Sequence, residues 1–158
     1  TDQAHAKAHF NVGVILYNRK DYAGARTALR KAIELDRFHE NAWYKYGQCL
    51  RKLGQKDDAK RAFARHKQIQ PLAQKIRSAE LSLPNNPNDH KTRFALAQAL
   101  AALGRFDEAV ACLRKLEHQR PDYPGLYEKL VDVCYKAGRE GLAKRYEKKL
   151  PSLKEDKD

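Results

Sequence analysis

Residues that could do chemistry are few in this sequence and stand in isolated pairs. His5 and His9 are four residues apart, so on a helix they would share one face and could chelate a metal ion. No third ligand accompanies them, and we interpret them as part of a solvated helix face. The sequence also lacks the motifs of phosphate-binding loops, dinucleotide sites, zinc proteases and activated serines. We therefore expect no cofactor, no bound metal and no enzymatic activity.

Two pairs of acidic residues and three cysteines are the other candidates. Asp57-Asp58 and Asp107-Glu108 each follow a short turn, where carboxylates stabilise the start of a helix, and we prefer this role to catalysis. The cysteines are far apart and outside any CxxC motif, so we expect neither a disulfide framework nor a zinc site. They occupy apolar helical positions, where we interpret them as small buried side chains, and they favour an intracellular location. These residues are Cys49, Cys112 and Cys134.

Composition limits the class of protein further. The chain has 158 residues, enough for one domain or a short array of repeats, and 33% of them are charged. No apolar run reaches the roughly 18 residues of a membrane-spanning helix, and the N-terminus does not resemble a signal peptide. Because methionine is absent, we expect the chain to be a piece of a longer protein. The net charge of +12 favours acidic partners, whether a protein, an anionic surface or a nucleic acid.

An internal repeat organises the elements that must position any site. Each copy has two apolar stripes at helical spacing, joined by a short turn that in three copies contains glycine. Small residues stand where the two helices of a pair must approach closely, at Gly13, Gly47 and Ala97. The pattern is clearest in residues 40–71, whose key positions are Trp43, Tyr46, Gly47, Leu50, Ala59, Phe63 and Pro71. If Trp43 is buried in this way, its replacement by alanine should cost about 3–5 kcal/mol.

These residues closely resemble the pattern of the tetratricopeptide repeat. The resemblance implies an all-α fold, a right-handed superhelical solenoid of four helix pairs with one extra helix between the second and third pairs. Two repeats, starting near residues 6 and 40, are expected in residues 1–71. Two more, starting near 90 and 124, are expected in residues 90–150, and a polar tail follows in residues 151–158.

The extra helix is expected within residues 72–89. An apolar stripe runs through residues 72–83 at spacings of four, three and four, with Pro71 at the first helical position, and a Pro/Asn-rich loop follows. Two interpretations are open: a joint that re-aims the second pair of repeats, or a decayed half-repeat stacked in line with the others.

The resemblance also implies a function, which is to bind a partner peptide or helix in a concave groove lined by the first helix of each repeat. An aromatic row flanked by basic residues would suit an extended protein ligand with apolar anchors and acidic residues. The same aromatic residues could instead only pack against neighbouring helices. The implied groove positions are Lys7, Phe10, Val14 and Tyr17 in the first repeat, Asn41, Tyr44, Gln48, Arg51 and Lys52 in the second, and Lys91, Phe94 and Gln98 in the third.

Positive charge is concentrated in residues 51–77, where nine basic residues face two acidic ones. This basic patch could bind nucleic acid or another polyanion, which is the alternative function. Its basic residues are separated by one aromatic, Phe63, which belongs to the repeat pattern, so base stacking is not favoured. Beyond the residues shared with the groove, the patch comprises Lys56, Lys60, Arg61, Arg65, Lys67, Lys75 and Arg77.

Overall fold

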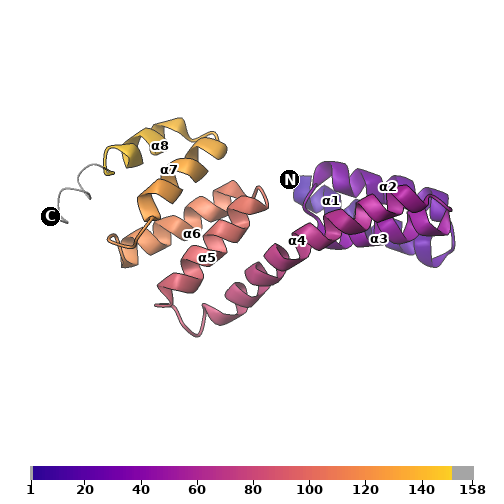
Figure 1. Ribbon diagram of the computed structural model, residues 1–158, viewed down its shortest axis with the longest axis horizontal. Coiled ribbons are helices and arrows are strands. Elements are labelled where there is room, and N and C mark those ends of the chain that lie inside the picture. Colours follow the sequence, from indigo (N-terminus) through magenta and orange to yellow (C-terminus); the bar gives the residue numbers. More distant parts are fainter. Residues whose placement is uncertain (1, 151–158) are drawn as a thin grey trace. The chain divides into compact units, whose positions relative to one another are not determined.

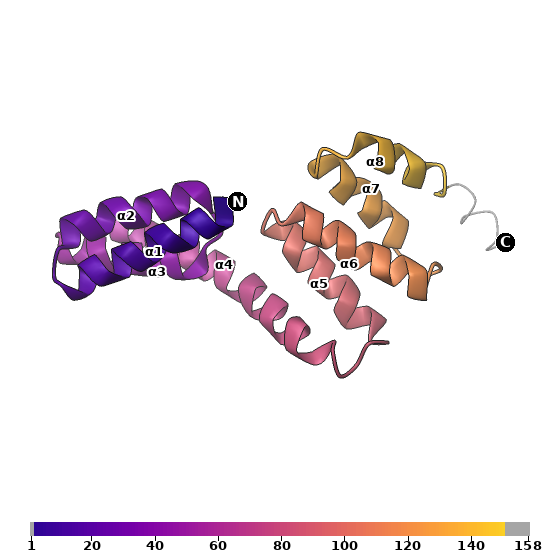
Figure 2. The same cartoon turned by 180° about the vertical axis from the view of Figure 1, so that it is seen from behind.

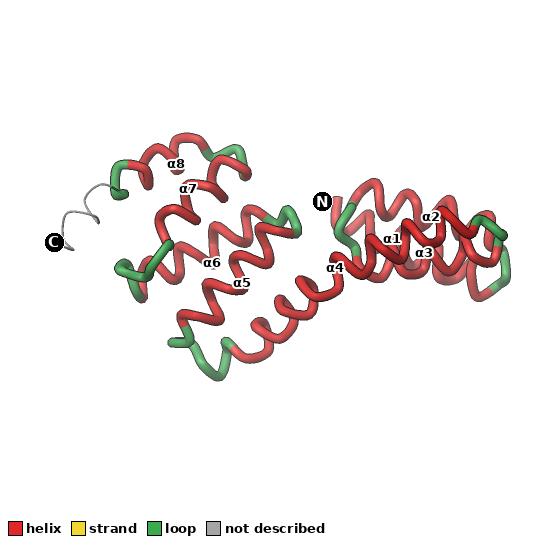
Figure 3. Tube along the Cα trace, viewed as in Figure 1, coloured by secondary structure: helices red, strands yellow, loops and turns green. Residues whose placement is uncertain are grey.

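The amphipathic stripes of the sequence form helices throughout the part of the chain that the structure, a computed structural model, describes, residues 2–150. Short loops join these helices, and no strand occurs within the described range (Figure 3). The expected polar tail, residues 151–158, lies outside it. In chain order the helices are α1 (Asp2–Asn18), α2 (Tyr22–Leu35), α3 (Glu40–Lys52), α4 (Lys56–Ser82), α5 (His90–Ala102), α6 (Phe106–Gln119), α7 (Leu126–Lys136) and α8 (Glu140–Glu147), as labelled in Figure 1.

The helices belong to two compact units that divide between Ala73 and Gln74. The first unit contains α1, α2, α3 and most of α4, and within it α2 packs against both α1 and α3. The second contains the last part of α4 and α5 to α8, with α6 packed against α5 and α7. Each predicted repeat is therefore a helix pair, and each pair packs against the next one in its unit.

The predicted close approaches are confirmed in the first unit. A Cβ atom on Gly13 would lie 2.5 Å from Cγ of Leu29, and one on Gly47 would lie 2.8 Å from Cε1 of Phe63. Any side chain larger than glycine would therefore displace the facing helix or its core residues. Leu29 is completely buried at this crossing and packs with Cys49 of α3.

The turns within the helix pairs adopt the expected left-handed conformation. Gly54, Gly104 and Gly138 have φ of +76°, +70° and +71°, and Lys20 takes the same conformation with φ of +66° in the first pair. After the first turn, the carboxylate of Asp21 accepts a hydrogen bond of 2.9 Å from the Gly24 amide and so caps the start of α2.

We expect Lys20→Gly to raise the free energy of unfolding by about 0.5–1 kcal/mol, because a side chain at positive φ is strained and glycine is not. Urea unfolding followed by the fluorescence of Trp43 would measure the change. The matched control is Gly54→Lys, at a site where a Cβ would meet nothing within 4 Å, which should lower stability by a similar amount. An unchanged unfolding midpoint for both variants would contradict the left-handed conformation of Lys20 and Gly54.

The predicted boundary at Pro71 is wrong, because α4 continues without interruption from Lys56 to Ser82 with Pro71 inside it. An internal proline removes one helical hydrogen bond and costs roughly 3 kcal/mol. Here the helix buries apolar side chains on both sides of the proline, with Ile69 1% exposed and Ile76 3% exposed. The stripe in residues 72–83 is therefore the last part of α4 and not a separate helix.

A partly buried polar network joins α8 and the residue Lys149 after it to α6 in the second unit. The Tyr146 hydroxyl donates to Glu117 over 3.0 Å, and the Lys149 ammonium donates to the same carboxylate over 2.6 Å. Burial and this hydrogen bond raise the pKa of Tyr146 to about 12. Burial alone would raise the pKa of Glu117, but the two donors outweigh it and hold that pKa below its usual value. The network fixes the last helix of the unit to its neighbour.

Candidate functional site

The predicted groove residues of the first repeat lie along one side of α1. Their spacings of three, four and three residues follow the helical period. Lys7 is exposed, and the other three members of the stripe are partly buried. The basic group therefore stands at the open end of a partly apolar stripe. The stripe consists of Lys7, Phe10, Val14 and Tyr17.

This side of α1 faces α3. The ring of Phe10 lies 4.8 Å from that of His39, the N-cap residue of α3, and the ammonium of Lys45 lies 4.6 Å from the centre of the Tyr17 ring. Phe10 also packs against the two core clusters around Leu29 and Ala32. Its aromatic ring therefore supports the fold as well as lining the groove.

On α3 the groove residues of the second repeat also share one side of the helix. Tyr44 is 44% exposed and its ring lies 5.1 Å from that of His66 on α4. Gln48 stands one turn later, and its side-chain oxygen is buried without a hydrogen-bond partner within the described chain. A buried acceptor of this kind is costly unless a donor reaches it. The remaining members, Asn41, Arg51 and Lys52, are exposed.

The two stripes share one electrostatic environment. Burial raises the pKa of Tyr17, the hydroxyls of Tyr22 and Tyr44 add to the increase, and the nearby guanidinium of Arg51 opposes it. At the other end, burial lowers the pKa of His39, and the charge of Lys7 acts in the same direction. Lys7 therefore lies near one end of the groove, where Asp36 and Glu40 oppose its effect on His39, and Arg51 lies near the other end.

Among the residues whose side chains the structure describes, 4–150, no carboxylate forms an ion pair with the basic groups of this groove, Lys7, Arg51 and Lys52. Two further groove residues, His39 and Lys45, are not apparent from the sequence, because their place depends on how α1 packs against α3. Only the parallel arrangement of the two helices brings them next to Phe10 and Tyr17.

The groove residues predicted in the third repeat belong to the second unit. Lys91 and Gln98 are exposed on α5, and Phe94 is partly buried with its ring 5.1 Å from that of Tyr123. A Cβ on Gly125 would touch the Phe94 ring at 3.7 Å. These residues form a separate patch within the second unit.

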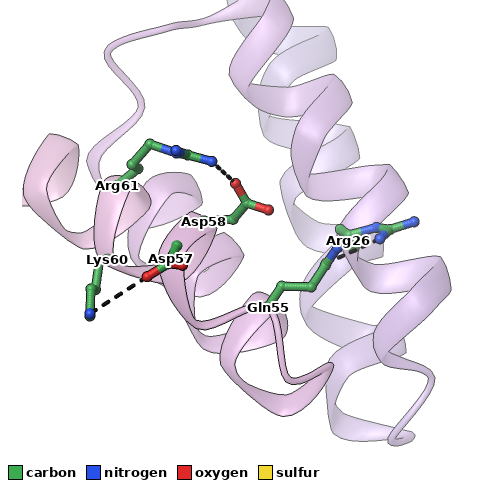
Figure 4. A network of polar contacts seen from close by, with 6 residues as sticks. All are labelled: Arg26, Gln55, Asp57, Asp58, Lys60 and Arg61. Atoms are coloured by element: carbon green, nitrogen blue, oxygen red, sulfur yellow. Dashed lines mark hydrogen bonds and ion pairs between the residues drawn. The ribbon is translucent and has the colours of Figure 1, made fainter.

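The predicted basic patch is divided and partly neutralised. Lys60 pairs with Asp57 at 3.6 Å and Arg61 pairs with Asp58, both within one turn of α4 (Figure 4). Arg65 donates to Gln68 over 3.1 Å and lies over the Phe38 ring. Of the other members, Lys56 and Lys67 are exposed in the first unit, and Lys75 and Arg77 are exposed in the second.

The candidate chemical groups do not gather into a site. Within the described residues no three side chains of the metal-binding types come together. Asp107 pairs with Arg139 at 2.7 Å, and Glu108 accepts two hydrogen bonds from Arg105, so this acidic pair is occupied structurally. Burial raises the pKa of the Cys49 thiol to about 11, far from the range of a reactive thiolate. None of the described helices is both long and apolar enough to cross a lipid bilayer.

Comparison with known proteins defines the class to which this fold belongs. Models of the tetratricopeptide repeat match residues 6–39, 28–61 and 90–133, which together make up more than half of the chain. The chain therefore belongs to the tetratricopeptide repeat family. Its all-helical fold is that of a protein-interaction scaffold, in which stacked helix pairs present extended binding surfaces.

Individual relatives are more distant. Anaphase-promoting complex subunit 3 of Schizosaccharomyces pombe is 25% identical over 145 residues, which cover 80% of this chain and 22% of that protein. The chain thus spans about a fifth of the length of this curated relative. The structure of MamA MSR-1 matches with a TM-score of 0.53 at 21% identity, covering 97% of this chain and 98% of that one. A structure of MamA AMB-1 matches with a TM-score of 0.52 at 22% identity over 97% and 93% of the two chains. These structural matches show a shared tetratricopeptide-repeat fold.

Proposed function

We propose that the first unit binds an extended peptide segment of a partner protein in the groove between α1 and α3. The observation that carries this proposal is that Lys7 and Arg51, two basic side chains without an ion pair in the described part of the chain, border the partly apolar groove. Lys7 borders one end and Arg51 the other, and neither forms an ion pair with a carboxylate whose side chain the structure describes. A ligand with acidic residues would supply the missing counter-charges.

The groove between these two cations suits apolar side chains of a ligand. Tyr17 and Tyr44 offer aromatic surface at low cost in side-chain entropy, and Tyr44 is substantially exposed before any ligand binds. The buried oxygen of Gln48 needs a donor, which a backbone amide of an extended peptide can provide. We therefore expect a ligand that alternates apolar and acidic side chains and donates at least one backbone hydrogen bond.

The test is affinity capture from native lysate with nuclease-treated and untreated halves. The test variant is Lys7→Glu combined with Arg51→Glu, because both side chains are exposed and neither belongs to the core. Phe10→Ala is unsuitable, since Phe10 packs against the core and its loss would weaken the fold. The matched control is Lys56→Glu combined with Lys67→Glu, which makes the same change of charge on α4.

We expect a protein partner that survives nuclease, is retained by the control variant and is lost with the groove variant. A synthetic peptide from that partner should bind the groove variant at least about tenfold more weakly, by fluorescence anisotropy, since each charge-assisted hydrogen bond contributes about 1.5–3 kcal/mol. Equal binding of that peptide to both variants would refute the proposal that it binds in the groove.

Nucleic-acid binding through the basic patch predicts the opposite pattern. Capture would then vanish with nuclease and with the α4 variant, and affinity would fall steeply as salt rises. The ion pairs of Lys60 and Arg61 within α4 reduce the charge available for this alternative.

A further inference from the structure

Two arginines lie against one aromatic ring in the first unit. The guanidinium carbon of Arg37 lies 4.8 Å from the centre of the Phe38 ring, and that of Arg65 lies 5.3 Å from it. Arg37 and Phe38 belong to the loop between α2 and α3, whereas Arg65 belongs to α4, which lies beside this loop in both views (Figures 1 and 2). All three residues lie within the first unit, and we call them the arginine cluster.

Hydrogen bonds hold both parts of the arginine cluster in place. In the loop, the indole of Trp43 donates a hydrogen bond of 2.8 Å to the Arg37 carbonyl. The Asp36 carboxylate accepts one of 3.0 Å from the Phe38 amide. On α4, Arg65 is half-buried and donates a hydrogen bond of 3.1 Å to a glutamine one turn further along the helix. A ligand would therefore meet groups that are largely positioned in advance, which lowers the entropic cost of binding.

The arginine cluster has no counter-charge among the side chains that the structure describes. Neither Arg37 nor Arg65 forms an ion pair with a carboxylate in that part of the chain. The acidic residue next to Arg37, Asp36, uses its carboxylate to accept an amide of its own loop. Arginine stays charged at physiological pH, so two guanidinium groups beside one ring repel each other unless an anion lies next to both. Lys60 and Arg61 of α4 differ in this respect, because each pairs with an acidic residue within one turn.

The presence of two guanidinium groups decides which anion fits. A phosphate monoester carries nearly two negative charges at neutral pH and three acceptor oxygens, which match two guanidinium groups. A carboxylate carries one charge and is satisfied by a single arginine. A nucleic-acid base that stacked on Phe38 would compete with the guanidinium groups that already lie over its ring. The arginine cluster therefore favours a phosphate monoester over a carboxylate or a nucleic acid.

The position of the arginine cluster favours a phosphate that belongs to a protein. Phe38 is followed in the chain by His39, whose ring lies 4.8 Å from that of Phe10 at one end of the groove. A peptide segment in the groove can therefore continue to the cluster. We propose that Arg37 and Arg65, held by the Phe38 ring, bind the phosphate of a phosphorylated side chain in a partner protein. The choice of a protein as the source rests on the proposed function, whereas the phosphate site itself does not.

The probe for this site is a blocked tripeptide with phosphoserine between two alanines, titrated into isotopically labelled protein and followed by NMR. The resonances to follow are the side-chain Nε–H groups of the arginines and the amide of Phe38. Comparison ligands are the same tripeptide with glutamate or serine in the middle and a single-stranded thymidine oligonucleotide. The test variant is Arg37→Gln combined with Arg65→Gln. The matched control, Lys56→Gln combined with Lys67→Gln, removes the same charge from exposed positions of α4.

We expect saturable shifts with the phosphoserine peptide and at least about tenfold weaker binding of the glutamate and serine peptides. The test variant should lose binding at least about tenfold, and the control should keep it. Equal binding by the test variant would overturn the proposal, as would equal binding of the glutamate peptide or tighter binding of the oligonucleotide. Circular dichroism checks the fold of the test variant. Arg37→Gln alone, at an exposed position, gives a second variant that leaves α4 intact and should also weaken binding.

Two further measurements separate this site from the groove. Arg51→Glu, which changes the cation at the far end of the groove, should bind the phosphoserine peptide normally. Phosphatase treatment of the lysate before affinity capture tests the protein source. The intact protein should then capture its partner at least about tenfold less, and the test variant should no longer respond to phosphatase. A partner that the intact protein captures equally well after phosphatase treatment would overturn the protein source of the phosphate.

Discussion

Leu29→Ala is expected to lower the free energy of unfolding of the first unit by about 3–4 kcal/mol. The side chain is completely buried where α1 crosses α2, and it occupies the space that Gly13 leaves free. Truncation removes apolar contacts and leaves a cavity that the close-packed helices cannot fill, and both effects destabilise. Urea unfolding followed by the fluorescence of Trp43 measures the change, because this single tryptophan of the chain lies in the same unit.

Two further variants sharpen this test. Ile15→Ala removes an apolar side chain from the exposed face of α1 and should cost about 0.5 kcal/mol or less. Gly13→Ala should destabilise the intact protein, since its Cβ would clash with Leu29, but should be tolerated better in the Leu29→Ala background. Additive effects of Gly13→Ala and Leu29→Ala would mean that the two side chains do not meet.

Trp43→Ala is expected to cost about 2–4 kcal/mol, somewhat less than the sequence pattern suggests. The indole is only partly buried, although it packs against the core around Ala32 and the core around Leu50. Its Nε1–H also donates to the Arg37 carbonyl over 2.8 Å, which ties α3 to the preceding loop.

Far-UV circular dichroism during urea unfolding is the measurement for Trp43→Ala, since the variant lacks the fluorophore. Trp43→Phe keeps most of the packing and loses the hydrogen bond, so it should cost about 1 kcal/mol. A loss below about 1 kcal/mol for Trp43→Ala would show that the indole contributes little to either core.

The helix pairs could be predicted from sequence because their determinants are local. Gly13 and Gly47 leave room for the facing helix of the same pair, and Gly54 adopts the left-handed conformation of the turn within its pair. The boundary at Pro71 was wrong for the opposite reason. The local cost of an internal proline is real, but the burial of Ile69 and Ile76 on either side of it is a tertiary effect that outweighs this cost.

The candidate sites divide in the same way. The sides of α1 and α3 follow from the helical period, but the ring contact of Phe10 with His39 and the position of Lys45 over Tyr17 depend on packing between helices. The sequence likewise shows the two acidic residues within the basic patch, but not that they pair with Lys60 and Arg61 in particular. An apolar stripe also does not reveal whether a neighbour covers it, so the exposure of Ile15 emerged only from the structure.

One buried cysteine in each unit can report how readily that unit unfolds locally. Cys49 in the first unit and Cys134 in the second are both completely shielded, and burial raises the pKa of each thiol. A thiol reagent can therefore modify each of them only while the surrounding helices are transiently apart. When the helices close faster than the reagent reacts, the modification rate at each cysteine, measured by mass spectrometry of the two peptides and divided by the rate for an exposed thiol, gives the fraction of time that its surroundings are open. Two core residues that are already present thereby make the local unfolding of each unit measurable without an added label.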